Sequence, residues 1–208
     1  MAERFASISD DLAQWWAEQP MFFVATAPAG SDGHVNLSPK GLDTLRILGP
    51  TRAAYLDLTG SGVETIAHVR ENGRITLMAC AFNGAPRISR IYGAGTVHEI
   101  GTQEFEQLAP KFPELPGRRA IVDVAVDRVS TSCGYAVPLM DLVEDRDRLL
   151  DWARAKGDDG LVEYRASKNA LSIDGIRGLE PRPAPQRAGG SNGHAPGAGV
   201  RGPEVAGE

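Results

Sequence analysis

The sequence predicts a mainly β fold of the α+β class, in which an antiparallel barrel or sheet is flanked by peripheral helices. About six segments have the alternating or β-branched composition of strands. Few helical segments separate them, which argues against a doubly wound parallel sheet. The predicted strands cover residues 21–28, 34–41, 52–58, 74–82, 88–100 and 119–132.

The chain is expected to begin with a helix that Pro20 ends. Ser9 suits its N-cap, and Asp10 and Asp11 then fall in the first turn, where the helix dipole favours acids. In the second predicted helix, Asn72-Gly73 supplies the C-terminal stop. The helices after the first are predicted over residues 63–72, 102–110, 145–156 and about 159–170.

Two glycines interrupt the long strand predicted over 88–100. Gly93 and Gly95 stand inside "ISRIYGAGTVHEI", where glycine has no side chain to pack. Such glycines in a strand indicate a bulge or a close approach of another backbone.

The chain of 208 residues is long enough for one domain with a substantial core, predicted over residues 5–180. The character changes at Pro181, because 17 of the last 28 residues are Gly, Pro or Ala. A segment of this composition buries too little apolar surface to offset its ordering entropy. Residues 181–208 are therefore predicted to be a disordered tail.

The overall charge argues against nucleic acid or an anionic membrane as partner. The net charge is -5 with a pI near 5.4, so no broad electrostatic attraction to either is expected. No apolar run approaches the roughly 18–20 residues that span a bilayer. The first residues lack a basic leader followed by an apolar block, so no signal peptide is expected. A cytoplasmic location follows as the expectation.

Cysteines and histidines are too scattered for a metal site. No HxH, HExxH or CxxC spacing occurs, and Cys80 and Cys133 do not form a ligand pair. Cys80 is expected in the core because it lies in an apolar strand. Cys133 precedes Gly134 and Tyr135 in an irregular loop, which leaves open an activated thiolate or an inert cysteine.

The stretch "TGSGVET" (59–65) is either a tight strand-to-helix turn or a phosphate cradle. It lacks the third glycine of a dinucleotide-binding fingerprint. A helix that starts near Val63 offers free N–H groups, which suit a phosphate ester. Hydroxyl and basic residues at the ends of the middle strands could join it: Ser38, Lys40, Thr59, Ser61, Arg87 and Arg90.

Several segments resemble the pyridoxamine 5'-phosphate oxidase-like flavoprotein family. They read "FFVATAP...GHVNLSPKG", "YLDLTGSGVETIAHVRENGRITLMAC" and "APRISRIYGAGTV". With "TSCGYAVPLM" and "SKNALSIDGIRGL" they resemble one uncharacterised branch, over about residues 12–179. The resemblance implies a six-stranded antiparallel split β-barrel with peripheral helices. It also implies a homodimer that binds FMN between its subunits.

The resemblance also implies cofactor-binding positions. The family's second-strand segment falls on Asn36, Leu37, Ser38 and Lys40, and Lys40 is expected near the flavin or its phosphate. The next segment and the phosphate grip at the helix start fall on Leu58, Thr59, Gly60, Ser61 and Thr65, with Arg87 as a further cation.

The sequence departs from the family pattern at the helix start. Glu64 and Thr65 occupy the place of an Arg-Lys pair in the well-understood oxidases, and a carboxylate beside a phosphate is unfavourable unless it points away. The deazaflavin F420 is therefore an alternative to FMN. Features that grip pyridoxal phosphate have no clear counterpart, which argues against the vitamin B6 oxidase reaction itself.

The predicted function is an FMN-dependent oxidoreductase whose small-molecule substrate is unknown. In such an enzyme the flavin carries the redox chemistry, and the protein supplies binding, orientation and electrostatics. Cys133 and Tyr135 are predicted on the substrate side of the flavin ring. The alternative is a non-catalytic protein that binds a flavin, F420, haem or a B6 vitamer.

Overall fold

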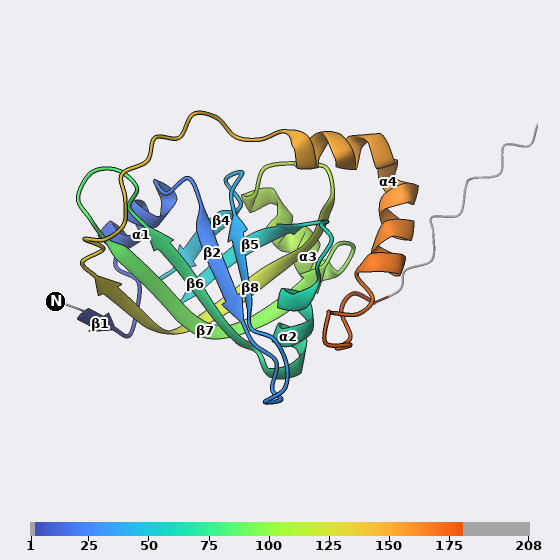
Figure 1. The fold of residues 1–208 in the computed structure, drawn as a ribbon, viewed down its shortest axis with the longest axis horizontal. Helices are drawn as coiled ribbons and strands as arrows, with labels where there is room; N and C mark the ends of the chain where they lie inside the picture. Colours follow the sequence, from blue (N-terminus) through green and yellow to red (C-terminus); the bar gives the residue numbers. More distant parts are fainter. Residues whose placement is uncertain (1–2, 181–208) are drawn as a thin grey trace, which may run out of the picture.

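The computed structural model describes residues 3–180, and the predicted tail lies outside them. Figure 1 shows a curved sheet with helices around it. Its strands are β1 (Glu3–Phe5), β2 (Phe22–Thr26), β3 (Asn36–Lys40), β4 (Leu45–Gly49), β5 (Arg52–Leu58), β6 (Arg74–Cys80), β7 (Ile88–Glu99) and β8 (Arg118–Ser132). Its helices are α1 (Asp10–Ala17), α2 (Glu64–Asn72), α3 (Gln103–Leu108), a short 3-10 helix (Ala109–Lys111) and α4 (Arg148–Lys168).

The strands form one antiparallel sheet in the order β3-β2-β6-β7-β8-β5-β4, with β1 added beside β8. The predicted mainly β antiparallel class is confirmed, but the predicted number of six strands is wrong, because the sheet has eight. The unpredicted β4 pairs with β5, and the unpredicted β1 pairs with β8.

The core lies inside the curve of the sheet. Alternate residues of the strands point inward, and the indole of Trp16 from α1 donates a hydrogen bond to Ser89 Oγ at 3.0 Å. The fully buried aliphatic side chains of this cluster include Val24, Leu77, Ile91, Val122 and Val124. The alternation that predicted the strands is thus the alternation between core and surface.

The helix boundaries follow the predicted caps. Ser9 Oγ accepts a hydrogen bond from the N–H of Leu12, and Gly73 ends α2 with φ 72° in the left-handed region. The two helices predicted at the end of the domain are one segment, α4, which kinks at Gly157. None of the helices within residues 3–180 is long and apolar enough to cross a bilayer.

Gly93 marks a bulge in the long β7–β8 pairing. The register shifts between Tyr92 and Gly93, and a Cβ at Gly93 would lie 2.1 Å from the carbonyl oxygen of Ala125. The predicted bulge and close backbone approach are both confirmed.

Candidate functional site

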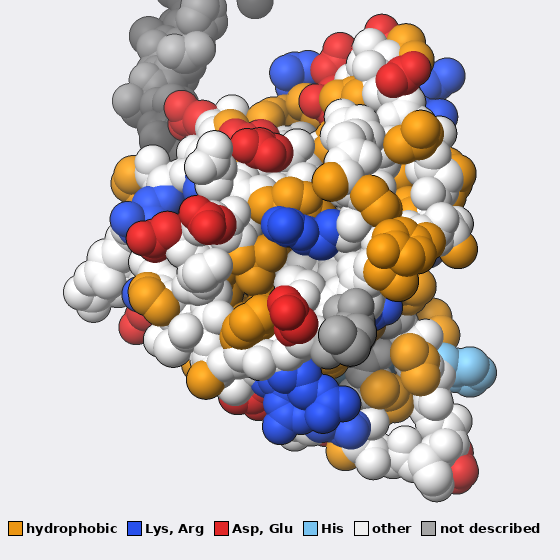
Figure 2. Space-filling view, turned by 90° about the vertical axis from the view of Figure 1, so that its left-hand side faces the viewer, with side chains coloured by type: hydrophobic (Ala, Val, Ile, Leu, Met, Phe, Trp, Pro, Cys, Tyr) orange, Lys and Arg blue, Asp and Glu red, His pale blue; other side chains and the backbone are white. Residues whose placement is uncertain are grey.

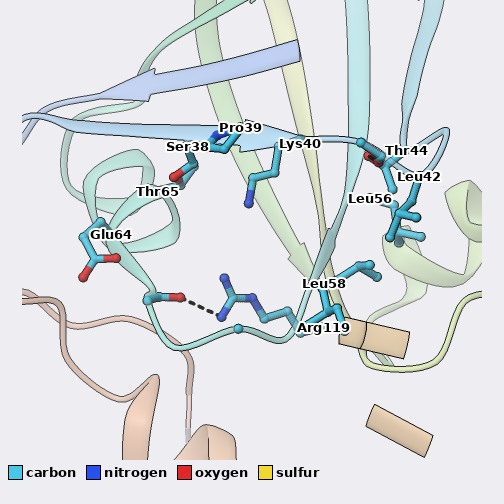
Figure 3. Close-up of a pocket in the computed structure, with 14 residues that line it drawn as sticks. Ser38, Pro39, Lys40, Leu42, Thr44, Leu56, Leu58, Glu64, Thr65 and Arg119 are labelled. Atoms are coloured by element: carbon cyan, nitrogen blue, oxygen red, sulfur yellow. Dashed lines mark hydrogen bonds between the residues drawn. The ribbon is translucent and has the colours of Figure 1, made fainter. Parts of the chain in front are cut away.

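A cavity of about 250 Å³ lies where β3 and β5 end and α2 begins (Figure 3). Its lining includes Ser38 and Lys40 from β3, Gly60 and Gly62 from the turn, and Thr65 from α2. Arg119 of β8 also lines the cavity. The fold therefore brings together the end of the second predicted strand and the glycine turn, which are about 20 residues apart in sequence.

Two cations share one buried carboxylate in this cavity. Lys40 Nζ lies 2.8 Å from Asp57 Oδ1, and Arg119 Nε lies 2.6 Å from Asp57 Oδ2. Burial by itself raises the pKa of Asp57, but the charges and hydrogen bonds of Arg119 and Lys40 lower it to about 2. Asp57 is therefore ionised at neutral pH and offsets part of the charge of its two cations, while Glu64 adds a second carboxylate to the lining.

The exposure of the two cations differs. Arg119 keeps only 5% of its side-chain surface, whereas Lys40 keeps 21%. In Figure 3 the Lys40 side chain extends into the space between β3 and Arg119. Lys40 is consequently the cation of this pair that can meet a bound anion.

Arg119 and Asn169 hold the glycine turn in place. Arg119 Nη1 donates to the carbonyl of Gly62 at 2.9 Å and to Asn169 Oδ1 at 3.0 Å. Asn169, which is fully buried after the end of α4, donates to the carbonyl of Gly60 at 3.0 Å. Both carbonyls of the turn are thereby engaged by side chains.

Glu64 does not place its charge against the Lys40 ammonium. Its carboxylate folds back over Gly62, where an added Cβ would lie 2.3 Å from Oε2. Its other oxygen accepts a hydrogen bond from the N–H of Ile173 at 3.3 Å. Figure 3 shows the carboxylate directed away from Lys40, although Glu64 still belongs to the lining of the cavity, at the glycine turn.

A buried polar network supports Thr65. Asn36 Nδ2 donates to Thr65 Oγ1 at 2.9 Å and to Thr26 Oγ1 at 3.2 Å, and Ser38 Oγ donates to Asn36 Oδ1 at 3.0 Å. His68 Nδ1 lies 3.1 Å from Thr26 Oγ1. The network fixes the Ser38 hydroxyl of β3 relative to the first turn of α2.

Five of the predicted cofactor residues line the cavity: Ser38, Lys40, Leu58, Gly60 and Thr65. Asn36 supports it through Thr65. Leu37 points outward with 62% of its surface exposed. Thr59 is buried, where its hydroxyl donates to the carbonyl of Gly117 and accepts from Arg165.

The structure does not bring Ser61 and Arg87 into this cavity within one chain. Ser61 is exposed on the turn, outside the lining. The Arg87 guanidinium lies 5.5 Å from the ring of Trp15, and its backbone packs against Gly134. Arg87 therefore belongs to the region where β8 ends.

Cys133 and Tyr135 lie in that same region, on either side of Gly134. Both are exposed, Tyr135 with 81% of its surface, and neither lines the Lys40 cavity. Cys80 is buried as predicted, and burial raises the pKa of its thiol. Within residues 3–180 no group of three or more His, Cys, Asp or Glu side chains is arranged to hold a metal ion.

The sequence did not reveal Asp57, Arg119 and Asn169 as parts of the site. One signal was present: Asp57 interrupts the apolar run "AAYLDL", and an acid at a buried strand position requires a partner. The sequence does not identify that partner, because Arg119 follows 62 residues later.

Comparisons with known proteins were consistent with one family. Residues 8–133 match the family model described as "Pyridoxamine 5'-phosphate oxidase". A relative from Aspergillus flavus, the "Pyridoxamine 5'-phosphate oxidase family protein ustO", is 40% identical over 192 residues, which cover 84% of this chain and 77% of the relative.

Solved structures resemble the chain more distantly. HupZ of Group A Streptococcus shares 19% identity with a TM-score of 0.45, and the match covers 59% of this chain and 91% of HupZ. An FAD-binding protein of Mycobacterium smegmatis shares 11% identity with a TM-score of 0.45, covering 61% of this chain and 96% of that protein. On the strength of the family model and the Aspergillus relative, the chain belongs to the pyridoxamine 5'-phosphate oxidase family and has its split-barrel fold class.

Proposed function

We propose that this protein is an FMN-dependent oxidoreductase that acts as a cytoplasmic homodimer. The observation that carries the proposal is the cavity at the start of α2, where two cations share one carboxylate and Glu64 is turned aside. Membership of the family supports a flavin as the ligand.

The residues present fit a phosphate group. The ammonium of Lys40, the hydroxyls of Ser38 and Thr65, and the first N–H groups of α2 meet at one cavity. Helix N-termini and charge-assisted hydrogen bonds favour phosphate oxygens. These groups would hold the phosphate end of the cofactor, and Arg119 would hold Lys40 and the turn in position through Asp57 and Gly62.

The size of the cavity supports a site shared between subunits. A pocket for a drug-sized ligand has a volume of about 300–1,000 Å³, whereas this cavity has about 250 Å³. The cavity within one chain is therefore smaller than the usual pocket for such a ligand, which is what a site shared between subunits would require. A second subunit would complete the site and place Leu37, which is exposed on the same strand β3, in contact with cofactor or partner.

Bound flavin would supply the electron transfer. The described residues that line the cavity include no His, Cys or Tyr, so no imidazole, thiol or phenol is present there for proton transfer. The same observation favours one second candidate, a protein that binds FMN, F420, haem or a B6 vitamer without turnover. In the enzyme, Cys133 and Tyr135 would approach the substrate side from the partner subunit.

The visible spectrum of the purified protein tests the cofactor. We expect flavin absorption bands and FMN in the mass spectrum of the material released by denaturation; F420 in its place would select the alternative cofactor. Anaerobic addition of NADH, NADPH or reduced F420 then distinguishes enzyme from binder, because only the enzyme cycles its flavin. A colourless protein that binds neither added FMN nor F420 would contradict the proposal.

Substitution of Lys40 tests the phosphate site. Lys40→Ala is expected to weaken FMN affinity by about tenfold or more, the scale of one charge-assisted contact. Lys168→Ala removes the same charge from an exposed position of α4 and should leave affinity unchanged. Fluorescence titration measures both, with thermal unfolding as the check on folding. Equal affinities in the two variants would remove Lys40 from the site.

A further inference from the structure

A second basic feature lies on the outer face of the sheet, where β1, β7 and β8 run side by side. Arg4 pairs in register with Ser130, and Ser130 pairs with Arg90 on its other side. Arg128 lies two positions before Ser130 on the same strand. Paired residues and residues two apart share one face of a sheet, so the three arginines point to the same side.

These arginines surround a groove of about 500 Å³, which we call the arginine groove. Its lining includes the hydroxyl residues Ser130 and Ser132, and Arg90 Nη1 lies 3.5 Å from Ser132 Oγ. Figure 2 looks at the side of the molecule that carries β1 and shows Lys and Arg side chains gathered on the lower part of that face. No residue is shared with the lining of the Lys40 cavity.

The charges of the groove are not balanced within the described chain. Across residues 3–180, no carboxylate forms an ion pair with Arg4, Arg90 or Arg128, whereas Arg52 and Arg119 of the same sheet have such partners. Asp127 is the single acid in the groove lining. Three arginines therefore face one acid on this part of the sheet, in a chain with a net charge of -5, which makes the groove a local basic site.

We propose that the arginine groove binds a phosphate-bearing small molecule. Arginine presents a planar fork of donors that matches phosphate oxygens, and the neighbouring serine hydroxyls add further donors. The groove is formed by paired strands, so its donors are held by the sheet. The site is independent of the proposed flavin site, and it indicates that a phosphorylated substrate or effector reaches this face.

Titration calorimetry with pyrophosphate as probe tests the groove on the full-length protein with its cofactor bound. We expect saturable binding that Arg90→Gln and Arg128→Gln each weaken by about tenfold, the scale of a charge-assisted contact. Arg154→Gln, an exposed position on α4 paired with Asp151, is the charge-matched control and should bind as the parent does. Thermal unfolding verifies that each variant is folded.

Lys40→Ala separates this proposal from the proposed function. If it leaves pyrophosphate affinity within about twofold while both groove variants weaken it, the anion binds in the groove. Weakening by Lys40→Ala alone would assign the anion to the flavin cavity and overturn the proposal. Absence of binding at millimolar pyrophosphate would overturn it too. So would groove variants that alter the oligomeric state and leave affinity unchanged, since the arginines would then serve a protein contact.

Discussion

At the residue scale, the buried charge of Asp57 governs both stability and the cavity. Asp57 is 1% exposed, and its two oxygens are bonded separately by Lys40 and Arg119. Removing one partner of a buried ion pair leaves an uncompensated charge, which costs about 3–5 kcal/mol. The ion pairs among Asp57, Lys40 and Arg119 therefore keep Lys40 at the cavity. Loss of any one of the three side chains is expected to lower the stability of the fold substantially.

Acid stability is expected to depend on Asp57. Its pKa is about 2 in the folded protein against an ordinary value of 3.8, so the unfolded chain binds the proton more readily. The carboxylate thus contributes about 2 kcal/mol of stability above pH 4, and this contribution is lost as the pH falls from about 4 to 2. Urea unfolding of the parent and of Asp57→Asn at pH 7, 4 and 2 measures it.

The expected result is a variant that is less stable at pH 7 and that loses less on acidification than the parent. Asp151→Asn alters an exposed pair with Arg154 and should change stability by less than about 1 kcal/mol. A parent and an Asp57→Asn variant with parallel pH profiles would show that Asp57 is not held ionised in the fold.

The sequence predicted the cavity residues that lie next to a recognisable turn. It did not predict those that reach the cavity only through strand pairing with a distant part of the chain. Lys40 and Thr65 stand next to recognisable turns, and the family resemblance identified them. Arg119 joins the cavity only because β8 pairs with β5 in a register that places Arg118 opposite Leu58. Arg87 lies beside Trp15 and Gly134, away from this cavity within one chain, because a position at a strand end does not show which end of the sheet it occupies.

At the scale of elements, the pairing of β7 with β8 depends on Gly93. The β8 backbone approaches so closely that no side chain fits, and the bulge at Tyr92–Gly93 lets both long strands bend around the core. The sequence predicted this feature because a glycine in a strand interior commonly marks a bulge or a close backbone approach.

Gly93→Ala is expected to destabilise the fold by about 1–3 kcal/mol, the range for overpacking. The added methyl would lie 2.1 Å from a backbone oxygen, which only a shift of the strand can relieve. Gly30→Ala, where the added atom meets nothing within 4 Å, is the matched control and should be close to neutral. Chemical unfolding measures both; equal stabilities would mean that the bulge tolerates a side chain.

The two strands that were not predicted, β4 and β1, lack the local sequence signals of a strand. β4 reads "LRILG", which lacks period-two alternation, and all five of its residues are half-buried. β1 is three exposed residues whose strand conformation depends on β8, more than 120 positions away in sequence. Both β4 and β1 take strand conformation because they pair with other strands. By contrast, α1 has its own N-cap and helical spacing of apolar residues, and these local features predicted it.

At the scale of the whole molecule, one segment argues for a partner. Between β8 and α4 the chain runs as an extended strap over the sheet (Figure 1). Besides Tyr135, its large exposed apolar side chains are Leu139, Met140, Leu142 and Val143, with exposures from 55% to 91%. Exposed apolar side chains gathered on one segment are typical of a contact surface, so this segment is the surface at which the proposed homodimer can be tested.

Charges placed in the strap are therefore expected to disrupt the proposed homodimer. The double variant Leu139→Asp/Leu142→Asp should raise the dimer dissociation constant by about tenfold or more, because apolar contacts at an interface core do not tolerate unpaired charge. Since the flavin would lie between subunits, FMN affinity should fall in parallel. Ala155→Asp, at an exposed position of α4 outside this segment, controls for added charge. Sedimentation analysis with and without FMN measures the effect. A parent protein that is monomeric under both conditions would refute the shared site. A double variant that remains dimeric would place the interface elsewhere on the sheet.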